Sequence, residues 1–187
     1  PSPVDVWDAY VDRHGIDGVF PVANTVLGRL ACVASEEILY PEIARALALR
    51  GAEVLLHSTS EIGSPEATPK DIAKRARAVE NLAFVVSANT GGMLDVPFPG
   101  ASTDGMSKIV DDGGRVLAAA GFGESMVAHA EIDIGGLRRR RLRPGMAHTL
   151  SRLPAAAINA GLAPAPVRAN WLLAADGSIR VPQRAEF

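Results

Sequence analysis

Ser35, Glu36 and Glu37 form the group with the clearest chemical potential in this chain of 187 residues. They follow a run of small apolar residues, 30–34, which predicts a strand buried on both faces. Pro41 then predicts the first turn of a helix. Ligands of α/β proteins bind where the carboxyl ends of strands face the starts of helices. The sequence therefore predicts a pocket lined by Glu36 and Glu37, and a capped, solvated turn without a ligand is the alternative.

Polar residues also follow the next two predicted strands along the chain. His57 and Glu61 lie at the first of these strand ends, and Asn89 and Thr90 lie at the second. The carboxyl ends of parallel strands meet at one edge of a sheet, so we expect these four residues to line the same pocket as Ser35. The alternative is two ordinary sheet-edge turns, together with a histidine whose hydrogen bonds are satisfied inside the core.

Several common site motifs are missing from the sequence. The segment 121–123 lacks the third glycine of a dinucleotide loop, and no Gly-Lys-Ser/Thr phosphate loop occurs. The segment 105–107 lacks the second glycine of a hydrolase nucleophile elbow. Cys32 is the single cysteine and the four histidines have no mutual ligand spacing, which excludes an internal disulfide and multi-cysteine metal sites. We expect neither a cofactor nor a metal ion.

The charge balance argues against several kinds of partner. Nineteen Lys and Arg against twenty-one Asp and Glu give a formal net charge of −2, so no basic excess attracts nucleic acid or an anionic membrane. The arginine run 138–141 is expected to be solvated or paired with carboxylates. No apolar run reaches the ~18 to 20 residues of a membrane helix. The N-terminus lacks a signal-peptide pattern, and a single cysteine fits a reducing compartment, so we expect a cytoplasmic protein.

The apolar patterns alternate between strand and helix, which predicts an α/β fold with helices packed on a largely buried sheet. The turn 111–114, Asp-Asp-Gly-Gly, predicts a hairpin late in the chain. The expected elements are strands 30–34, 54–57, 84–88, 108–110, 115–118 and 126–132, and helices from Pro41 to Arg50 and from Pro69 to Asn81.

Composition divides the chain into three parts: an irregular lead-in at 1–25, an α/β core at 26–134 and an extended arm at 135–187. The arm begins with the arginine run and becomes rich in Ala and Pro, with large apolar anchors at 171–173. This pattern suits packing against a neighbouring surface better than forming a core of its own. We therefore expect a homo-oligomer held partly by the arm.

Five ordered blocks of the sequence resemble the nitrilase superfamily of carbon–nitrogen hydrolases, and together they span about residues 20 to 143. The resemblance implies an αββα sandwich, here a partial one that lacks the N-terminal part, whose subunits pair to continue the layers. The blocks run from Gly28 to Glu42, from Ala44 to Leu55, from Arg75 to Asn81, from Val85 to Asn89, and from Gly105 to Asp133 with a gap after Gly114.

The resemblance also implies a chemistry, the hydrolysis of a small amide- or nitrile-like molecule. Members of the family use a cysteine nucleophile, a lysine that stabilises the tetrahedral oxyanion and a glutamate base. Aligning the blocks places Ser35 at the position of the cysteine and Glu36 at that of an aromatic residue, while Glu37 keeps the acid that follows. Cys32 lies three residues earlier, and this odd spacing along a strand points its side chain to the opposite face, into a packed layer.

Two departures from the family pattern concern the catalytic groups. A serine alkoxide is much harder to generate than a cysteine thiolate. The family's glutamate and lysine lie upstream of the nucleophile strand, but residues 1–27 contain neither type, and the first lysine is Lys70. We therefore expect a carbon–nitrogen hydrolase that has diverged at its nucleophile and is truncated, with this chain alone inactive. The alternative is a catalytically inactive nitrilase-like protein that binds or assembles.

Overall fold

The chain divides into two compact units, one made of residues 1–21 and 154–187 and the other of residues 22–153. The candidate site lies entirely within the second unit. The computed structural model describes residues 6–61, 68–93, 95, 97, 103, 105–122, 125–143, 145–146, 148–162 and 172–181.

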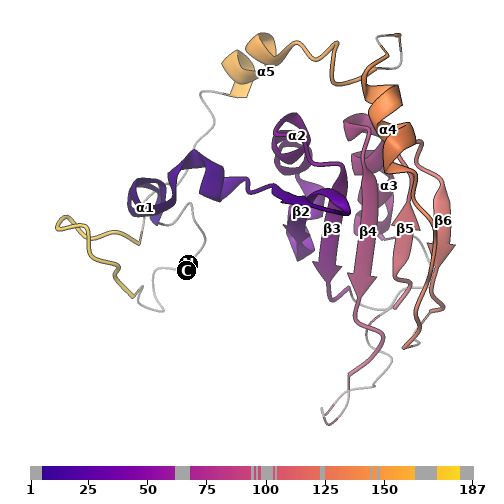
Figure 1. Cartoon of the computed structure of the whole chain (residues 1–187). Coiled ribbons are helices and arrows are strands. Elements are labelled where there is room, and N and C mark those ends of the chain that lie inside the picture. The colour runs from indigo at the N-terminus through magenta and orange to yellow at the C-terminus, as the bar shows by residue number, and fades with distance from the viewer. Residues whose placement is uncertain are drawn as a thin grey trace. The chain divides into compact units, whose positions relative to one another are not determined.

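One six-stranded sheet forms the centre of the larger unit, with its strands side by side in chain order (Figure 1). The middle strands β2, β3 and β4 are parallel, and β1, β5 and β6 pair antiparallel with their neighbours. The α/β prediction is confirmed. The strands are β1 (Ala23–Thr25), β2 (Gly28–Ala34), β3 (Val54–Thr59), β4 (Phe84–Asn89), β5 (Lys108–Val110) and β6 (Val116–Ala119).

Helical segments make both parallel crossovers, as the sequence predicts. The 3-10 helix η2 (Ser35–Leu39) and α2 (Pro41–Leu49) connect β2 to β3, and α3 (Pro69–Asn81) connects β3 to β4. Each α-helix has a proline at its start, where the missing N–H costs nothing. Thr68 caps α3 by accepting a hydrogen bond from the backbone N–H of Asp71 at 3.1 Å.

The two faces of the sheet are covered differently. On the face toward α2 and α3, Val33, Leu55, Val85 and Val110 are almost fully buried. On the other face, α4 (Ile134–Arg141) places Leu137 against Val54 and Phe84. Further along this second face, four side chains lie in register across β2 to β5: Cys32, Leu56, Val86 and Ile109. Cys32 is exposed and the other three are half-buried.

The packed environment expected for Cys32 is therefore wrong. Strand alternation does place its side chain on the face opposite Val33, but α4 covers that face near Val54 and Phe84 and, among the described residues, nothing buries Cys32.

The tight hairpin between β5 and β6 explains one glycine. Gly114 has a φ of +79°, and a Cβ atom there would lie 2.6 Å from the Cγ2 atom of Val79 on α3. Both the conformation and the close approach favour glycine. The predicted hairpin at 111–114 is confirmed by the antiparallel pairing of its strands.

The expected lead-in at 1–25 contains more regular structure than predicted. Residues Trp7–Val19 form helix α1, kinked at Gly15, and β1 belongs to the sheet. The strand expected at 126–132 is also wrong: Met126 and Val127 are largely exposed, and these residues join no sheet.

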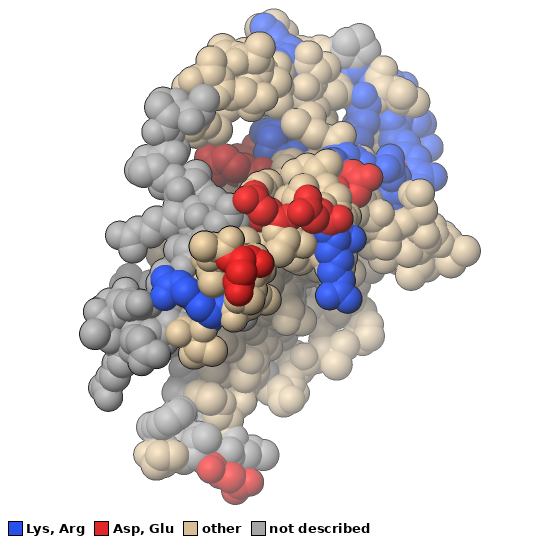
Figure 2. All heavy atoms as spheres, turned by 90° about the vertical axis from the view of Figure 1, so that its left-hand side faces the viewer, with Lys and Arg blue, Asp and Glu red and all other residues tan. Residues whose placement is uncertain are grey.

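The first part of the expected arm at 135–187 packs on the sheet instead. Leu137 is fully buried, Arg138 pairs with Glu53 at 2.6 Å, and Arg140 pairs with Asp112. Arg141 donates to three backbone carbonyl oxygens of the core. Arg138, Arg139 and Arg140 are thus paired with carboxylates, one of the two surroundings expected for the run, whereas Arg141, among the described residues, is not. Figure 2 shows basic and acidic side chains on the same face, so neither sign covers it alone.

Further along, the smaller unit contains α5 (Ala155–Leu162) and a bridge between Leu173 and Ile179. Leu172 is 6% exposed, whereas the anchor Trp171 lies outside the described residues. No helix among the described residues is long and apolar enough to cross a membrane.

Candidate functional site

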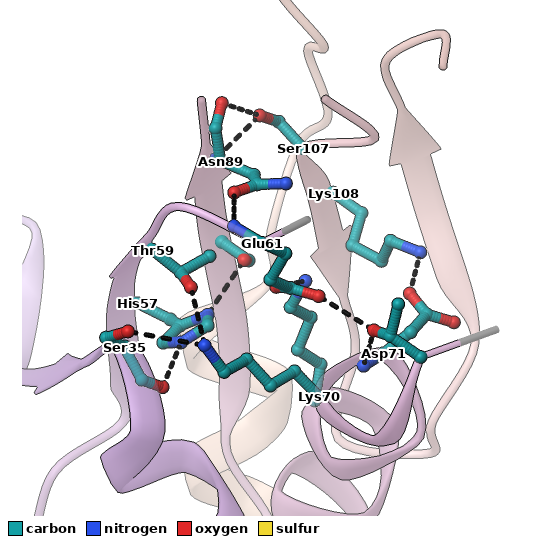
Figure 3. Close-up of polar contacts among 12 residues, drawn as sticks. Ser35, His57, Thr59, Glu61, Lys70, Asp71, Asn89, Ser107 and Lys108 are labelled. Carbon is teal, nitrogen blue, oxygen red and sulfur yellow. Dashed lines mark hydrogen bonds and ion pairs between the residues drawn. The ribbon is translucent and has the colours of Figure 1, made fainter. Parts of the chain in front are cut away.

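Ser35 occupies a conformation that is rare for a serine. It is the first residue after β2, with a φ of +42° in the left-handed region. Such backbone strain persists where the surrounding structure imposes it, and it is concentrated at functional sites. The turn places the half-buried hydroxyl between the end of β3 and the start of α3 (Figure 3).

His57 holds this turn through hydrogen bonds to its backbone and to the neighbouring strand. Its Nε2 atom lies 3.0 Å from the backbone oxygen of Ser35, and its Nδ1 atom lies 2.9 Å from the hydroxyl oxygen of Ser87. A carbonyl oxygen can only accept, so Nε2 carries the hydrogen and Nδ1 accepts from Ser87. Burial lowers the pKa of His57, which keeps the ring neutral at pH 7. His57 is thus a satisfied core histidine that holds the backbone of Ser35.

Lys70, in the first turn of α3, brings a cation to the Ser35 hydroxyl. Its Nζ atom donates to Ser35 Oγ at 3.3 Å and to Thr59 Oγ1 at 3.4 Å (Figure 3). The same atom pairs with Glu36 Oε1 at 2.6 Å. The lysine side chain is 12% exposed and that of Glu36 is 66% exposed. The ammonium is therefore held from inside by two hydroxyls and from the solvent side by a carboxylate.

Glu61 and Lys74 form a second, deeply buried ion pair one helical turn further along α3. Their charged atoms are 2.6 Å apart, and their side chains are 3% and 2% exposed. Glu61 also accepts from the hydroxyl of Thr68 at 2.8 Å and donates its backbone N–H to the Asn89 side chain at 2.8 Å. This network satisfies both buried charges and fixes the start of α3, from which Lys70 projects.

The remaining predicted site residues bond to backbone groups. Glu37 accepts from the N–H of Ala34 at 2.7 Å and closes the start of η2. The Asn89 side chain donates to the carbonyl oxygen of Gly105 at 2.8 Å. The backbone N–H of Thr90 donates to the carbonyl oxygen of Thr59 at 3.2 Å.

The structure therefore brings the predicted residues together in two groups. Ser35, Glu36 and His57 meet at the turn after β2, beside Lys70, while Glu61, Asn89 and Thr90 lie at the neighbouring strand ends. Their role in lining one pocket stays a prediction.

Sequence reasoning missed Lys70 and Lys74. A signal for the first was present, because a lysine beside the N-terminus of a predicted helix opposes the helix dipole. The parallel topology then places that helix start at the same edge of the sheet as Ser35. The described residues hold no group of three or more His, Cys, Asp or Glu side chains that could bind a metal ion.

The fold and this turn define an α/β protein with a strained residue at the carboxyl end of a parallel strand, directly before a helical segment. The sequence model of the carbon–nitrogen hydrolase family matches residues 3–142. The chain belongs to this family, the nitrilase superfamily.

Two curated relatives illustrate the match. The chain is 36% identical over 126 residues to the 2-oxoglutaramate amidase of Bacillus subtilis, covering 67% of this chain and 45% of that protein. It is 31% identical over 115 residues to a probable nitrilase of Schizosaccharomyces pombe, covering 62% of this chain and 40% of that protein. The chain thus spans less than half the length of these two relatives.

Solved structures support the same fold. A carbon–nitrogen hydrolase from Helicobacter pylori matches with a TM-score of 0.60 and 27% identity, over 74% of this chain and 50% of that one. An amidase variant from Nesterenkonia sp. AN1, described with acrylamide added at its active-site cysteine, matches with a TM-score of 0.60 and 25% identity, over 76% of this chain and 48% of that one. The nitrilase-like fold predicted from the sequence is confirmed.

Proposed function

We propose that this chain carries the part of an amide- or nitrile-hydrolysing site that holds the nucleophile, with Ser35 in the position of the family's cysteine. The Ser35 corner is the group formed by Ser35 and the residues around it: Glu36, His57, Thr59 and Lys70. We propose further that the 187 residues alone bind a small amide without hydrolysing it. The observation that carries the proposal is the left-handed Ser35 at the end of β2, whose hydroxyl lies 3.3 Å from a lysine ammonium. Family membership and the amidases among the relatives support the reaction class.

Hydrolysis through Ser35 would require the removal of a proton. The Oγ atom would attack the amide carbonyl carbon while the hydroxyl proton passes to a base. The tetrahedral intermediate would then release ammonia as that proton is returned to the nitrogen, and water would hydrolyse the acyl-serine that remains. Lys70 pairs with Glu36 and donates to Oγ, so its ammonium cannot accept that proton. Glu37 is bonded to the backbone of Ala34. In this arrangement the hydroxyl is positioned but not activated.

The described residues do supply two other requirements of the reaction. A neutral His57 holds the backbone of Ser35 through its carbonyl oxygen, and Lys70 positions the hydroxyl by donating a hydrogen bond to its Oγ atom. Resemblance to the family implies that the base is a glutamate upstream of the nucleophile strand.

The same contacts favour a second candidate function, binding without chemistry. A hydroxyl that accepts a hydrogen bond from a paired ammonium is a poor nucleophile but a good recognition group. A nitrilase-like protein of this kind would bind an amide or serve in assembly.

The test combines calorimetry with an assay for ammonia release, using butyramide as the probe. We expect the wild-type chain and the Ser35→Cys variant to bind butyramide and to release no ammonia. The Ser35→Trp variant fills the corner and should lose binding, while Val116→Trp, at an exposed position at the start of β6 and the sheet edge opposite Ser35, should keep it.

Two results would contradict the proposal. No binding of butyramide by the wild-type chain would overturn the site itself. Ammonia release that Ser35→Ala abolishes, or an acyl adduct on Ser35→Cys seen by mass spectrometry, would show that the chain hydrolyses amides without a further base.

We also propose that the protein is a homo-oligomer. Support comes from the row of Cys32, Leu56, Val86 and Ile109, an apolar strip that the described residues leave partly exposed. Light scattering at micromolar concentration should give a multiple of 19.6 kDa. Leu56→Lys should lower that mass, whereas Ile72→Lys, on the exposed side of α3, should not. A wild-type monomer would contradict this proposal.

The cytoplasmic location stays a prediction.

A further inference from the structure

We propose that Lys70 binds a carboxylate group of the ligand and that Glu36 occupies the place of that carboxylate when no ligand is bound. The ligand of the Ser35 corner is then an amide that also carries a negative charge. This inference rests on the function proposed above, because it concerns the same corner, and it adds the chemical class of the molecule bound there.

The location of Lys70 is not explained by the stability of its own helix. It is the second residue of α3, where the positive end of the helix dipole disfavours a cation. The needs of this helix end are already met by the Thr68 cap and by the acidic side chain of Asp71 in the first turn. A lysine side chain that is only 12% exposed is also uncommon. The position of the ammonium beside the Ser35 hydroxyl is therefore unfavourable for the stability of α3.

The counter-ion of Lys70 differs from those of its neighbours. Lys74 pairs with Glu61, whose side chain is 3% exposed, and Lys108 pairs with Asp71, whose side chain is 22% exposed. Both of those carboxylates are held inside the structure. The carboxylate of Glu36, at 66% exposed, reaches Lys70 from the solvent side. Of these three ion pairs, the one beside Ser35 is the one that a molecule arriving from solvent can open.

Displacing Glu36 costs little. An ion pair with so exposed a carboxylate typically favours its closed form by about two- to fivefold, and a ligand carboxylate restores the same charge-assisted contact. Ser35 Oγ and Thr59 Oγ1 still hold the ammonium in place, at 3.3 and 3.4 Å. The site is therefore preorganised for an anion before the ligand binds.

The spacing of these groups sets the size of the ligand. Lys70 Nζ and Ser35 Oγ are 3.3 Å apart, so one small molecule can place a carboxylate on the first and an amide on the second. Two or three carbon atoms between the two groups are enough. Succinamate, the monoamide of a four-carbon dicarboxylic acid, has this form, and succinamide is its uncharged counterpart.

Calorimetry with these two probes tests the inference on the full chain. We expect wild type to bind succinamate more tightly than succinamide. Glu36→Gln removes the internal competitor and should tighten succinamate binding about two- to fivefold. Lys70→Gln keeps a hydrogen-bond donor but removes the charge, and it should weaken succinamate binding about tenfold. Neither variant should change the affinity for succinamide by more than about twofold.

Glu42→Gln is the matched control, because Glu42 is an exposed carboxylate in the first turn of α2 and should leave both affinities unchanged. Equal binding of the two probes by wild type, with no effect of Glu36→Gln, would overturn this inference and leave the proposed amide site intact. A failure of wild type to bind either probe would instead overturn the proposed function.

Discussion

The Nε2–H group of His57 donates to the backbone carbonyl oxygen of Ser35 at 3.0 Å and so joins the middle of β3 to the strained residue after β2. The opposite ring nitrogen is bonded to Ser87 on β4, in the next strand of the sheet. One neutral ring thus spans three neighbouring elements and fixes the conformation on which the Ser35 hydroxyl depends.

Replacing His57 by leucine should destabilise the protein and disorder the corner. The change leaves the Ser35 carbonyl and the Ser87 hydroxyl without their partner, a loss of about 1–3 kcal/mol for buried groups. Urea unfolding measures the free energy of unfolding, and butyramide binding reports on the corner. His129→Leu, at an exposed histidine, is the control. Equal stability of the two variants would show that the His57 contacts contribute little.

The neutral state of His57 also predicts a pH dependence. Its pKa is lowered in the folded protein, chiefly by burial, so below its ordinary value of about 6.5 the unfolded chain binds a proton that the folded chain does not. The free energy of unfolding should therefore fall as the pH decreases from about 6.5 toward the lowered pKa. The urea midpoint of the wild type should show this slope between pH 7 and pH 5, and His57→Gln should reduce it. An unchanged slope in that variant would assign the effect to other groups.

The buried pair of Glu61 and Lys74 predicts strong coupling. Either Glu61→Gln or Lys74→Met alone leaves a buried charge unpaired and should cost about 3–5 kcal/mol of unfolding free energy. The double variant should cost clearly less than the sum, because no buried charge remains. Arg139→Gln, which breaks an ion pair exposed on both sides, should stay within about 1 kcal/mol of wild type. Additive effects of the two buried changes would contradict the pairing.

Leu137 should be the critical side chain of α4. It is fully buried against Val54 and Phe84, so Leu137→Ala should cost about 2–5 kcal/mol of unfolding free energy. Leu142→Ala, at the C-cap of the same helix where the side chain is 82% exposed, should change it by less than about 0.5 kcal/mol. Similar effects of the two changes in urea unfolding would mean that α4 does not pack on the sheet.

The parallel part of the fold is predictable from the sequence because its signals are local. The buried strands are short apolar runs, and Pro41 and Pro69 mark the helix starts. The segment 126–132 has an apolar pattern too, yet the sheet ends at β6 and this segment does not pair with it. Whether an apolar segment becomes a strand depends on a neighbouring strand to pair with, and its own residues do not encode that neighbour.

The candidate site is predictable only in part, for a related reason. Ser35 and Glu36 lie next to each other in the chain, so their position at a strand end follows from local signals. Lys70 lies 35 positions later in the chain and reaches Ser35 only when β3 pairs with β2. The choice of Glu36 as its counter-ion is a matter of side-chain geometry that no sequence pattern specifies.

The exposure of Cys32 gives the chain an intrinsic chemical reporter. Its thiol is the single one in the sequence, and it begins the partly uncovered row on the sheet face opposite α2 and α3. The rate at which an alkylating reagent modifies it therefore measures the accessibility of that face, without any engineered label. A fall in this rate with increasing protein concentration would locate a subunit contact there, and a constant rate would direct the search to another surface.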